Sequence, residues 1–237
     1  MKLIIKLVLT LLLYINLAAQ TERNPLFEYC SGTWCGSCAC GYVTLNNIII
    51  PNNPNAIMIA YHGYATSSDP FARFVGNEIV DSLGFVAYPN GIVDRTMEPN
   101  SFTSCNNVLS DRNRTPAGVE ISLTTKYNNS RNYSVFVKVH PFAKLSGDYY
   151  LQLFLLEDSL TANQAGGGDC PGGDEFLFNN ICREVLSGVR GELIYSGNSW
   201  MSSDTISLYK EFLLNEDFEE ANCKIVAVVY KKESELN

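Results

Sequence analysis

The cysteines of this 237-residue chain fall into two groups, one crowded and one scattered. Four of the eight lie within eleven residues near the front: Cys30, Cys35, Cys38 and Cys40. The other four are spread over the rest of the chain: Cys105, Cys170, Cys182 and Cys223. Closely spaced thiols predict redox or metal chemistry, whereas widely spaced thiols in an oxidising compartment predict structural disulfides.

The crowded group contains the motif Trp34-Cys35-Gly36-Ser37-Cys38. Cys35 falls where a helix is expected to begin, so unpaired backbone N–H groups and the positive helix end stabilise its thiolate. The lowered pKa makes Cys35 the nucleophile that attacks a substrate disulfide. Cys38, one helical turn later, is placed to attack the resulting mixed disulfide. We expect Trp34 to cover this site, and no bound cofactor is needed because the electrons come from a partner thiol.

Two other interpretations of these cysteines compete with redox chemistry. The Cys35–Cys38 pair is compatible with a permanent structural disulfide in a domain that has lost exchange activity. A zinc site made from all four crowded cysteines has the right ligand type. One strand residue and three residues at a helix start converge poorly, however, so we expect no metal. The sequence alone assigns no role to four of the thiols: Cys30, Cys40, Cys105 and Cys182.

The elements expected around the motif form an α/β unit. Apolar segments over residues 26–29 and 56–61 have the length of buried strands. A helix over residues 36–48 fits between them, and a second helix is expected over residues 69–84. The order strand, helix, strand, helix predicts a parallel strand pair with crossover connections. A short strand over residues 91–94 and a polar, irregular stretch follow.

Beyond residue 116 the hydrophobic period changes to two, which predicts half-buried antiparallel strands. The segments with this pattern, or with strand-like composition, are 119–123, 133–139, 149–155, 191–195, 205–212 and 224–230. About six or seven strands of this kind favour a β-sandwich. We therefore expect an α/β domain over residues 20–115 and an all-β domain over residues 116–237.

A glycine-rich segment over residues 166–173 lies between those strands. It lacks the Gly-Lys-Ser/Thr ending of a phosphate-binding loop, so we expect a flexible loop pinned by Cys170. His62 and His140 are expected to be hydrogen-bonded structural histidines rather than catalytic bases.

The N-terminus predicts export. Lys2 and Lys6 precede an apolar stretch over residues 7–17, and Ala18 and Ala19 follow it. This is the layout of a cleaved secretory signal over residues 1–19, because a membrane-spanning helix needs roughly twenty apolar residues. We expect the mature chain in the periplasm, the outer envelope or the extracellular space.

The net charge narrows the choice of partners. Loss of the signal removes two of the 17 basic residues and none of the 25 acidic ones, which moves the net charge from −8 to −10. A chain this acidic is not expected to bind nucleic acid or an anionic membrane surface. The expected partners are the thiols or disulfides of exported proteins, and no later segment is apolar enough to span a bilayer.

Motifs along the chain resemble two known families. The Cys-x-x-Cys motif resembles that of the thioredoxin superfamily, a likeness that extends over residues 26–95. Motifs along nearly the whole mature chain are similar to the twenty-eight-kilodalton outer-membrane-protein-related (Omp28-related) family: Gly32-Thr33-Trp34-Cys35-Gly36-Ser37-Cys38, Ala60-Tyr61-His62-Gly63, Asp69-Pro70-Phe71, Gly76-Asn77-Glu78, Tyr88-Pro89-Asn90-Gly91-Ile92-Val93-Asp94-Arg95 and Cys170-Pro171-Gly172-Gly173. This second resemblance implies an exported protein in which a thioredoxin-like α/β domain precedes an immunoglobulin-like antiparallel β-sandwich.

The thioredoxin resemblance also implies a role for Pro89. A cis proline at this place in that fold lies against the cysteine pair and presents backbone to a docking substrate chain. We therefore expect a cis Tyr88–Pro89 bond next to Cys35 and Cys38, with Trp34, Tyr88 and Pro89 contacting the substrate.

One position departs from the thioredoxin pattern. Tyr29 stands five residues before the tryptophan of the motif, where thioredoxins keep a buried carboxylate. Glu28 is one place earlier, so its side chain is expected on the opposite face of the strand. Proton transfer to and from Cys38 is therefore left without an assigned group.

Cys170 is expected to form a structural disulfide with Cys223 or Cys182. We favour Cys223, because that bond would tether the glycine-rich loop to the start of the last strand. Closing so long a loop stabilises a fold by about 3 to 5 kcal/mol in the chain-entropy estimate.

Two functions follow from these observations. The first is a thiol–disulfide oxidoreductase that acts on exported proteins through Cys35 and Cys38. The second is a non-enzymatic secreted or outer-envelope protein that binds a partner or serves a structural role. The strand-rich second half, which simple disulfide exchange does not need, favours the second function.

Overall fold

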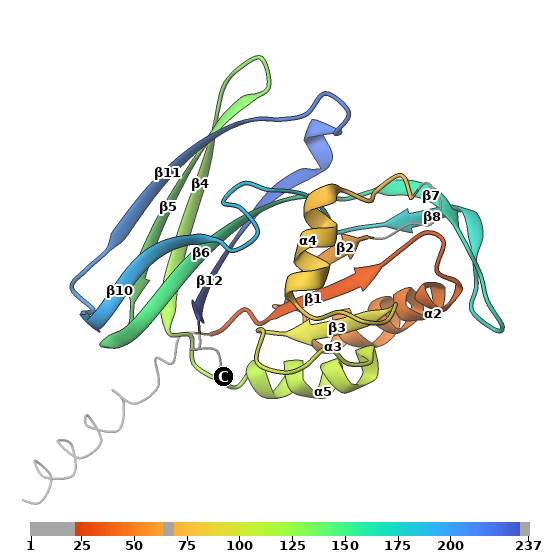
Figure 1. The fold of residues 1–237 in the computed structure, drawn as a ribbon, viewed down its shortest axis with the longest axis horizontal. Coiled ribbons are helices and arrows are strands. Elements are labelled where there is room, and N and C mark those ends of the chain that lie inside the picture. The colour runs from red at the N-terminus through yellow and green to blue at the C-terminus, as the bar shows by residue number, and fades with distance from the viewer. Residues whose placement is uncertain (1–21, 64–68, 233–237) are drawn as a thin grey trace, which may run out of the picture.

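The computed structural model describes residues 22–63 and 69–232 and is mostly β, with mixed sheets (Figure 1). The predicted signal over residues 1–19 lies outside the described residues. Three sheets are present in the described part, and the largest has seven strands in the order β10-β6-β9-β2-β1-β3, with β12 paired to β6.

The first half contains three strands and the helices that cover them. The strands are β1 (Leu26–Ser31), β2 (Ile57–His62) and β3 (Asn90–Val93). The helices are α2 (Gly36–Thr44), which continues through the π-helical η1 (Leu45–Ile49) into α3 (Ile50–Asn52), and then α4 (Phe74–Ser82) and α5 (Phe102–Arg112). Strand β1 pairs in parallel with β2 and antiparallel with β3, so the predicted parallel pair is present.

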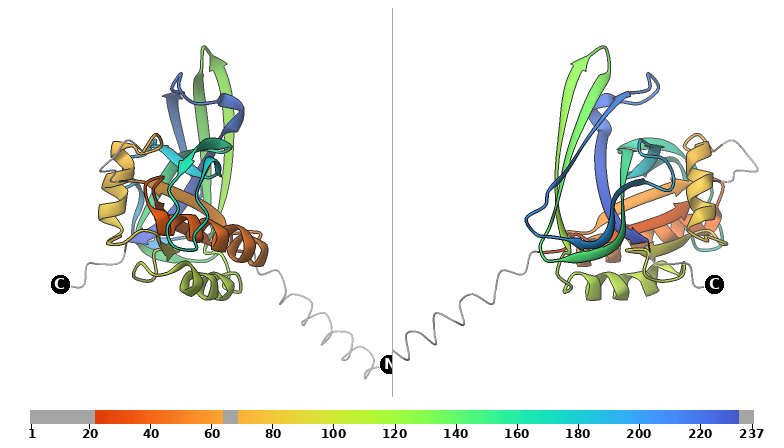
Figure 2. Two further views of the ribbon diagram at one scale, coloured as in Figure 1. Left: turned by 90° about the vertical axis from the view of Figure 1, so that its right-hand side faces the viewer. Right: turned by 60° about the vertical axis from the view of Figure 1, so that its left-hand side comes forward.

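The two faces of the β1–β2 pair bury different side chains because successive residues of a strand point to opposite faces. Phe27, Tyr29 and Ala60 belong to the cluster that packs under α2 and α5. Cys30 and Tyr61 belong to the cluster on the other face, which α4 covers. Figure 2 shows α4 on one side of the sheet, with α2 and α5 on the other.

Helix α4 is shorter than the predicted segment 69–84, since it begins at Phe74 after the N-cap residue Arg73. The side chain of Asp69 does not cap this helix. It accepts hydrogen bonds from the backbone N–H groups of Thr33 and Phe71 instead. A carboxylate held by donors outside the helix cannot satisfy the N–H groups of its first turn, so the helix begins later.

The second half contains two sheets that face each other. The predicted alternating segments form β4 (Val119–Asn129), β5 (Asn132–Pro141), β6 (Leu145–Glu157), β10 (Glu192–Trp200), β11 (Ile206–Leu213) and β12 (Cys223–Lys232). Strands β11, β5 and β4 form one sheet, and β10, β6 and β12 belong to the large sheet. Their facing side chains make one apolar cluster, which contains Val135, Val137, Leu151, Leu153 and Trp200.

Strand β9 (Ile181–Val185) joins the two halves. It pairs in parallel with β2 and antiparallel with β6, so one sheet runs across residue 116. Strand β6 shows the consequence in its burial, because residues 151–157 are all buried whereas its first half is partly exposed. Leu153 packs in the apolar cluster between the two facing sheets and Phe154 packs in the cluster under α4, so both faces of this part of β6 are covered.

A hairpin that the sequence did not predict packs next to α2. It consists of β7 (Leu160–Gln164) and β8 (Gly173–Phe178), joined by the glycine-rich segment. Phe178 is fully buried among aromatic rings of the first half, 5.2 Å from the ring centre of Tyr42 and 5.1 Å from that of Phe71. A segment of the second half therefore completes the core of the first.

Candidate functional site

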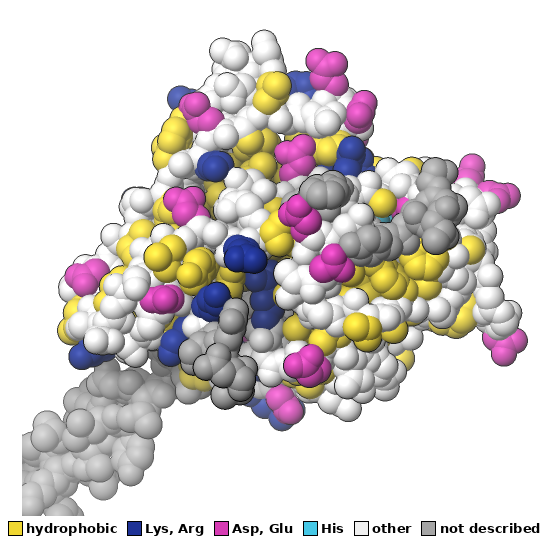
Figure 3. All heavy atoms as spheres, viewed as in Figure 1, with side chains coloured by type: hydrophobic (Ala, Val, Ile, Leu, Met, Phe, Trp, Pro, Cys, Tyr) yellow, Lys and Arg dark blue, Asp and Glu magenta, His cyan; other side chains and the backbone are white. Residues whose placement is uncertain are grey.

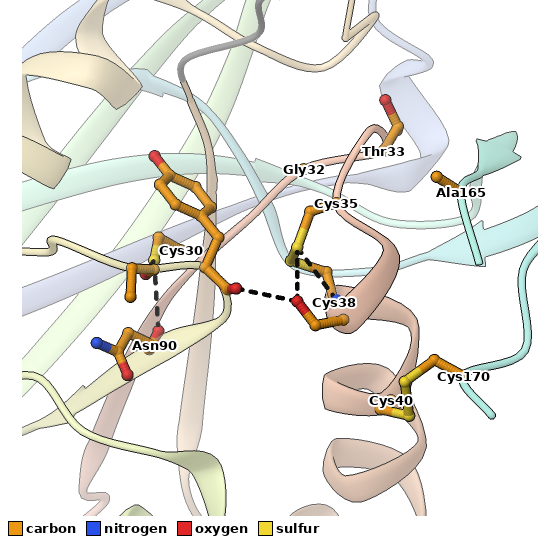
Figure 4. Close-up of a disulfide and its surroundings, with 12 residues drawn as sticks. Cys30, Gly32, Thr33, Cys35, Cys38, Cys40, Asn90, Ala165 and Cys170 are labelled. Carbon is orange, nitrogen blue, oxygen red and sulfur yellow. Dashed lines mark hydrogen bonds between the residues drawn. A yellow bond between two sulfur atoms is a disulfide. The ribbon is translucent and has the colours of Figure 1, made fainter. Parts of the chain in front are cut away.

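The cysteine motif lies at the start of α2, where β1 ends (Figure 4). A turn closed by a 3.1 Å hydrogen bond from the N–H of Cys35 to the carbonyl oxygen of Gly32 leads into the helix. Cys35 is the N-cap residue, and its Sγ accepts a 3.1 Å hydrogen bond from the N–H of Cys38. The two cysteines form a disulfide, with Cys35 5% and Cys38 1% exposed. The predicted position of Cys35 at a helix start is confirmed.

The loop before β3 lies beside this disulfide. The Tyr88–Pro89 peptide bond is cis, as expected. The hydroxyl of Ser37, which lies between the two cysteines, donates a 3.2 Å hydrogen bond to the carbonyl oxygen of Tyr88. The rings of Trp34 and Tyr88 are 5.3 Å apart. The structure therefore places Tyr88 beside the motif, where it contacts Trp34 and Ser37.

Gly41 allows Pro89 to come close to α2. A Cβ atom at Gly41 would lie 2.9 Å from Cγ of Pro89, which is closer than real Cβ atoms approach. A side chain at this position would push the Pro89 loop away from the helix that carries the motif.

A second segment covers the motif from the opposite direction. Residues 164–172, which we call the strap, run along the start of α2. The N–H of Ala165 donates a 2.7 Å hydrogen bond to the carbonyl oxygen of Thr33, and the side-chain amide of Gln164 donates to the carbonyl oxygen of Cys35 at 2.9 Å. A Cβ atom at Gly36 would lie 2.9 Å from the carbonyl oxygen of Gly166. The strap thus satisfies backbone carbonyls of the motif turn and packs directly on the helix start.

A disulfide between Cys40 and Cys170 attaches the strap to α2 (Figure 4). The two residues are 130 positions apart in sequence. Cys170 does pin the glycine-rich loop, as the sequence predicted, and Cys40 is the residue to which it is pinned.

The predicted Cys170–Cys223 disulfide is therefore wrong. Cys223 begins β12, where it pairs with Glu157 of β6, and its thiol is free. Cys182, the other partner considered, is also free and is buried in β9. The β7–β8 hairpin places Cys170 next to α2 instead. No local sequence pattern predicts that the hairpin packs there.

The free thiols are poor nucleophiles. Burial raises the pKa of Cys30 and of Cys105 to about 12, and that of the half-buried Cys223 to about 11. Burial also raises the pKa of Cys182. A neutral thiol is a poor nucleophile toward a disulfide, so these four cysteines are unsuited to disulfide exchange. Within residues 22–63 and 69–232, no group of His, Cys, Asp and Glu side chains is arranged to hold a metal ion.

A buried polar chain touches the motif turn. His62 Nδ1 lies 3.0 Å from Asp69 Oδ2, and Tyr42 Oη lies 3.1 Å from His62 Nε2. Asp69 Oδ2 also accepts a 2.8 Å hydrogen bond from the N–H of Thr33, two residues before Cys35. Burial opposes ionisation of Asp69, but the bonds from His62, Thr33 and Phe71 outweigh it and hold its pKa below the usual value.

Sequence reasoning treated His62 as a structural histidine, and the structure supplies the hydrogen bonds expected of one. Sequence reasoning did not identify Tyr42 or Gln164 as parts of the site, and it did not find the role of Asp69. In the sequence, Tyr42 has the pattern of an apolar helix position, and Asp69 has the pattern of a helix N-cap. His140 lies far from the motif in β5, 3.4 Å from the hydroxyl of Thr205.

Acidic side chains are spread over the visible face of the molecule, and a few basic ones gather near its middle (Figure 3). Among the helices that the structure describes, none has the length and apolar character needed to cross a membrane.

The fold and site define a class: a mostly β protein with mixed sheets, in which one disulfide caps a helix and a second clamps a strap beside it. The family model for "Outer membrane protein Omp28" matches residues 77–237, and the chain belongs to this family. The protein is accordingly exported and associated with the cell envelope. The matched region begins after the motif, so it includes the strap but not Cys35 or Cys38.

Two solved structures from Porphyromonas gingivalis are similar to the chain. HBP35 matches with a TM-score of 0.70 and 16% sequence identity, covering 88% of this chain and 69% of that one. At this identity the match concerns the fold alone. A domain of the outer membrane lipoprotein Omp28 matches with 21% identity over 48% of this chain and 77% of that one, but its TM-score of 0.29 carries no structural argument. A comparison with curated proteins finds no match.

Proposed function

We propose that this protein is an exported thiol–disulfide oxidoreductase that uses Cys35 and Cys38. The observation that carries the proposal is the position of Cys35 at the N-cap of α2, where its sulfur accepts a hydrogen bond from the N–H of Cys38. Such a bond, together with the positive helix end, stabilises a thiolate after the disulfide is reduced. In this mechanism Cys35 attacks a disulfide of an exported protein, and Cys38 attacks the mixed disulfide that results.

The surroundings of the motif support docking of a substrate chain. Val86 and Ala87 precede the cis Tyr88–Pro89 bond and are exposed, with Val86 91% exposed. The carbonyl oxygen of Ala87 already accepts a hydrogen bond from the Cys30 thiol, so the backbone of Val86 is the part proposed to pair with an extended peptide. The half-buried rings of Trp34 and Tyr88 offer apolar contact beside Cys35. The proposed substrate is therefore an extended, cysteine-containing segment rather than a small molecule.

The proposal includes a thioredoxin-like unit over residues 20–115 and an immunoglobulin-like unit over residues 116–237. In favour of the first are the parallel β1–β2 pair, the antiparallel β3 and the helices on both faces. In favour of the second is the packing of two antiparallel layers around one apolar cluster. Strand β9 and Phe178 belong to the second unit in sequence but pack with the first.

Single-cysteine variants of the full mature chain test this function. We expect the reduced protein to exchange thiols with a model disulfide, and Cys35→Ala to lower the rate to that of a thiol-free background. Cys38→Ala should still react but remain trapped as a mixed disulfide, because the first attack survives and resolution does not. Cys223→Ala, which removes a half-buried free thiol, serves as the matched control and should react like the unmodified protein.

A structural role is the second candidate, and two observations favour it. Cys35 is only 5% exposed, and the strap packs on the helix start that carries it. If the pair resists reduction, or if Cys35 of the reduced protein labels with iodoacetamide at a pKa no lower than about 8.5 and exchanges no disulfide, the pair is a structural disulfide. The trapping variant would then capture no partner.

A further inference from the structure

Resolution of a mixed disulfide needs an acceptor for one proton. Cys38 must lose its thiol proton before its sulfur attacks, because the thiolate is the nucleophile. Cys38 is 1% exposed, so water has little access to it. The buried carboxylate of Glu28 is not available, since it lies on the other face of the sheet and accepts hydrogen bonds from Arg95 and Tyr61. The acceptor must therefore come from another buried group.

The strand register places His62 on the correct face. In the parallel β1–β2 pair, Tyr29 lies opposite Ala60 and Ser31 lies opposite His62. Tyr29 and Ala60 belong to the cluster under α2. His62, two residues beyond Ala60, continues this face at the end of β2, next to the point where β1 leads into the motif.

The hydrogen bonds of His62 indicate which of its two ring nitrogens carries the proton. The pKa of Asp69 is held low by its three donors despite burial, so the carboxylate is an acceptor and the proton lies on His62 Nδ1. In a neutral imidazole the other nitrogen, Nε2, then has a free lone pair. It accepts the hydrogen bond of the Tyr42 hydroxyl, which lies 3.1 Å away.

Tyr42 connects His62 to the helix of the motif. It follows Cys38 by four residues in α2, and both side chains are buried. Residues four apart lie on one helix face, and a long helical side chain leans toward the preceding turn. Tyr42 therefore shares a helix face with Cys38, and its hydroxyl bonds His62. Burial raises the pKa of Tyr42, so the hydroxyl keeps its proton unless another proton replaces it.

The remaining neighbours of His62 carry little charge. Phe71 and Phe178 each place a ring 5.4 Å from the imidazole, and Gly76 of α4 packs at its backbone carbonyl. Arg183 of β9 lies over the Phe71 ring and pairs with Glu157. Asp69 is thus the charged group bonded to His62, and its carboxylate oxygen accepts the hydrogen bond of Nδ1.

We propose that Tyr42, His62 and Asp69 form a proton-transfer chain that accepts the thiol proton of Cys38 when Cys38 resolves the mixed disulfide. The inference rests on the proposed oxidoreductase function. Cys38 and the Tyr42 hydroxyl act directly in the transfer, and Asp69 positions His62 by holding Nδ1 while its backbone contact at Thr33 fixes the motif turn.

The step balances in atoms and electrons. The proton of the Cys38 thiol passes to the Tyr42 oxygen as the Tyr42 proton passes to His62 Nε2. The Cys38 thiolate then attacks Cys35, so the Cys35–Cys38 bond forms and the bond between Cys35 and the substrate sulfur breaks. The substrate sulfur leaves with the electron pair, and the protein dithiol is oxidised as the substrate disulfide is reduced. The leaving thiolate or solvent removes the proton from His62.

The test separates attack from resolution in the reduced full mature chain. After mixing with a model aromatic disulfide, samples are quenched in acid, and peptide mapping by mass spectrometry follows the adduct on Cys35. In Tyr42→Phe and His62→Gln we expect the adduct to form at the unmodified rate but to resolve more slowly, by about 100-fold or more, at pH 7. The difference should shrink at alkaline pH, where Cys38 ionises without an acceptor.

Controls distinguish this inference from its alternatives. His140→Gln makes the same chemical change far from the motif and should leave both rates unchanged. Tyr42→Phe keeps the buried ring, so it tests the chain even if His62→Gln does not fold. Unchanged resolution in folded Tyr42→Phe across the pH range would overturn the chain. No adduct in the unmodified protein would overturn the oxidoreductase function instead.

Discussion

Two buried carboxylates lie on opposite faces of the same pair of strands, and they are hydrogen-bonded by different kinds of partner. Glu28 receives two hydrogen bonds from the guanidinium of Arg95, at 2.7 and 2.6 Å, and one from Tyr61 at 2.6 Å. Asp69 is bonded to His62 and to the N–H of Thr33. An arginine guanidinium only donates hydrogen bonds, whereas a histidine ring has one nitrogen that donates and one that accepts. The first arrangement fixes a charge, and the second can move a proton beside the motif.

The strap adds to this difference, because it covers only the α2 side, where Asp69 and the motif lie. No comparable segment of the described residues is attached by a disulfide to the side where Glu28 lies. Three variants test this difference between the two faces, first at the strap disulfide and then at Glu28 and Asp69.

Removal of the strap disulfide should have the largest effect. Replacing Cys40 and Cys170 by serine opens a loop of 130 residues, so we expect unfolding free energy to fall by about 3 to 5 kcal/mol in the chain-entropy estimate. Urea unfolding under non-reducing conditions measures it. The reduced Cys35 should also label faster with iodoacetamide, because the strap packs on its helix. Cys223→Ser is the control, and an equal loss there would contradict the assigned pairing.

Glu28→Gln should come next in size. It leaves the Arg95 guanidinium buried without its counter-ion, and loss of one partner of a buried pair costs about 3 kcal/mol or more. Thermal and urea unfolding measure the loss, with the exposed Glu175→Gln as a control. The pH profile of disulfide resolution should stay unchanged, because this carboxylate has no bond to the motif turn. A shifted profile would mean that the two faces are coupled.

Asp69→Asn should cost less at neutral pH, about 1 to 3 kcal/mol, because the amide oxygen can still accept one backbone N–H. The effect that identifies the role of Asp69 is a change in how the free energy of unfolding depends on pH. The folded pKa of Asp69 is lowered, so the carboxylate contributes stability above its unfolded pKa of roughly 4, and this stability is lost as the pH falls through the folded value. Urea unfolding between pH 3 and 7 should therefore show a smaller acid loss in Asp69→Asn than in the unmodified chain. Parallel curves would contradict this assignment.

The sequence predicted the local part of the site well. The strand before the motif, the helix start at Cys35 and the cis Tyr88–Pro89 bond are all present. Each depends on residues close together in the chain or on a resemblance carried by a short motif. The face assigned to Glu28 was also correct, because the alternation of side chains along a strand follows from backbone geometry.

The predictions that failed concern contacts between distant segments. The helix expected from Asp69 begins at Phe74, because Asp69 bonds to Thr33, 36 residues earlier in the chain. The β7–β8 hairpin has short strands with weak alternation, so neither its existence nor its docking on α2 was visible. The pairing of Cys170 with Cys40 follows from that docking and not from cysteine spacing.

The sequence by itself determined the places of most strands, the thiols that meet at a helix start and the segments that alternate between core and solvent. Periodicity and cap chemistry act over a few residues, so they can be read locally. Only the tertiary structure decided which segment covers the motif, which cysteine the strap reaches and which buried carboxylate bonds to the motif turn. Those choices depend on how whole apolar surfaces pack, with Phe178 filling the core under α2 and so bringing the strap with it.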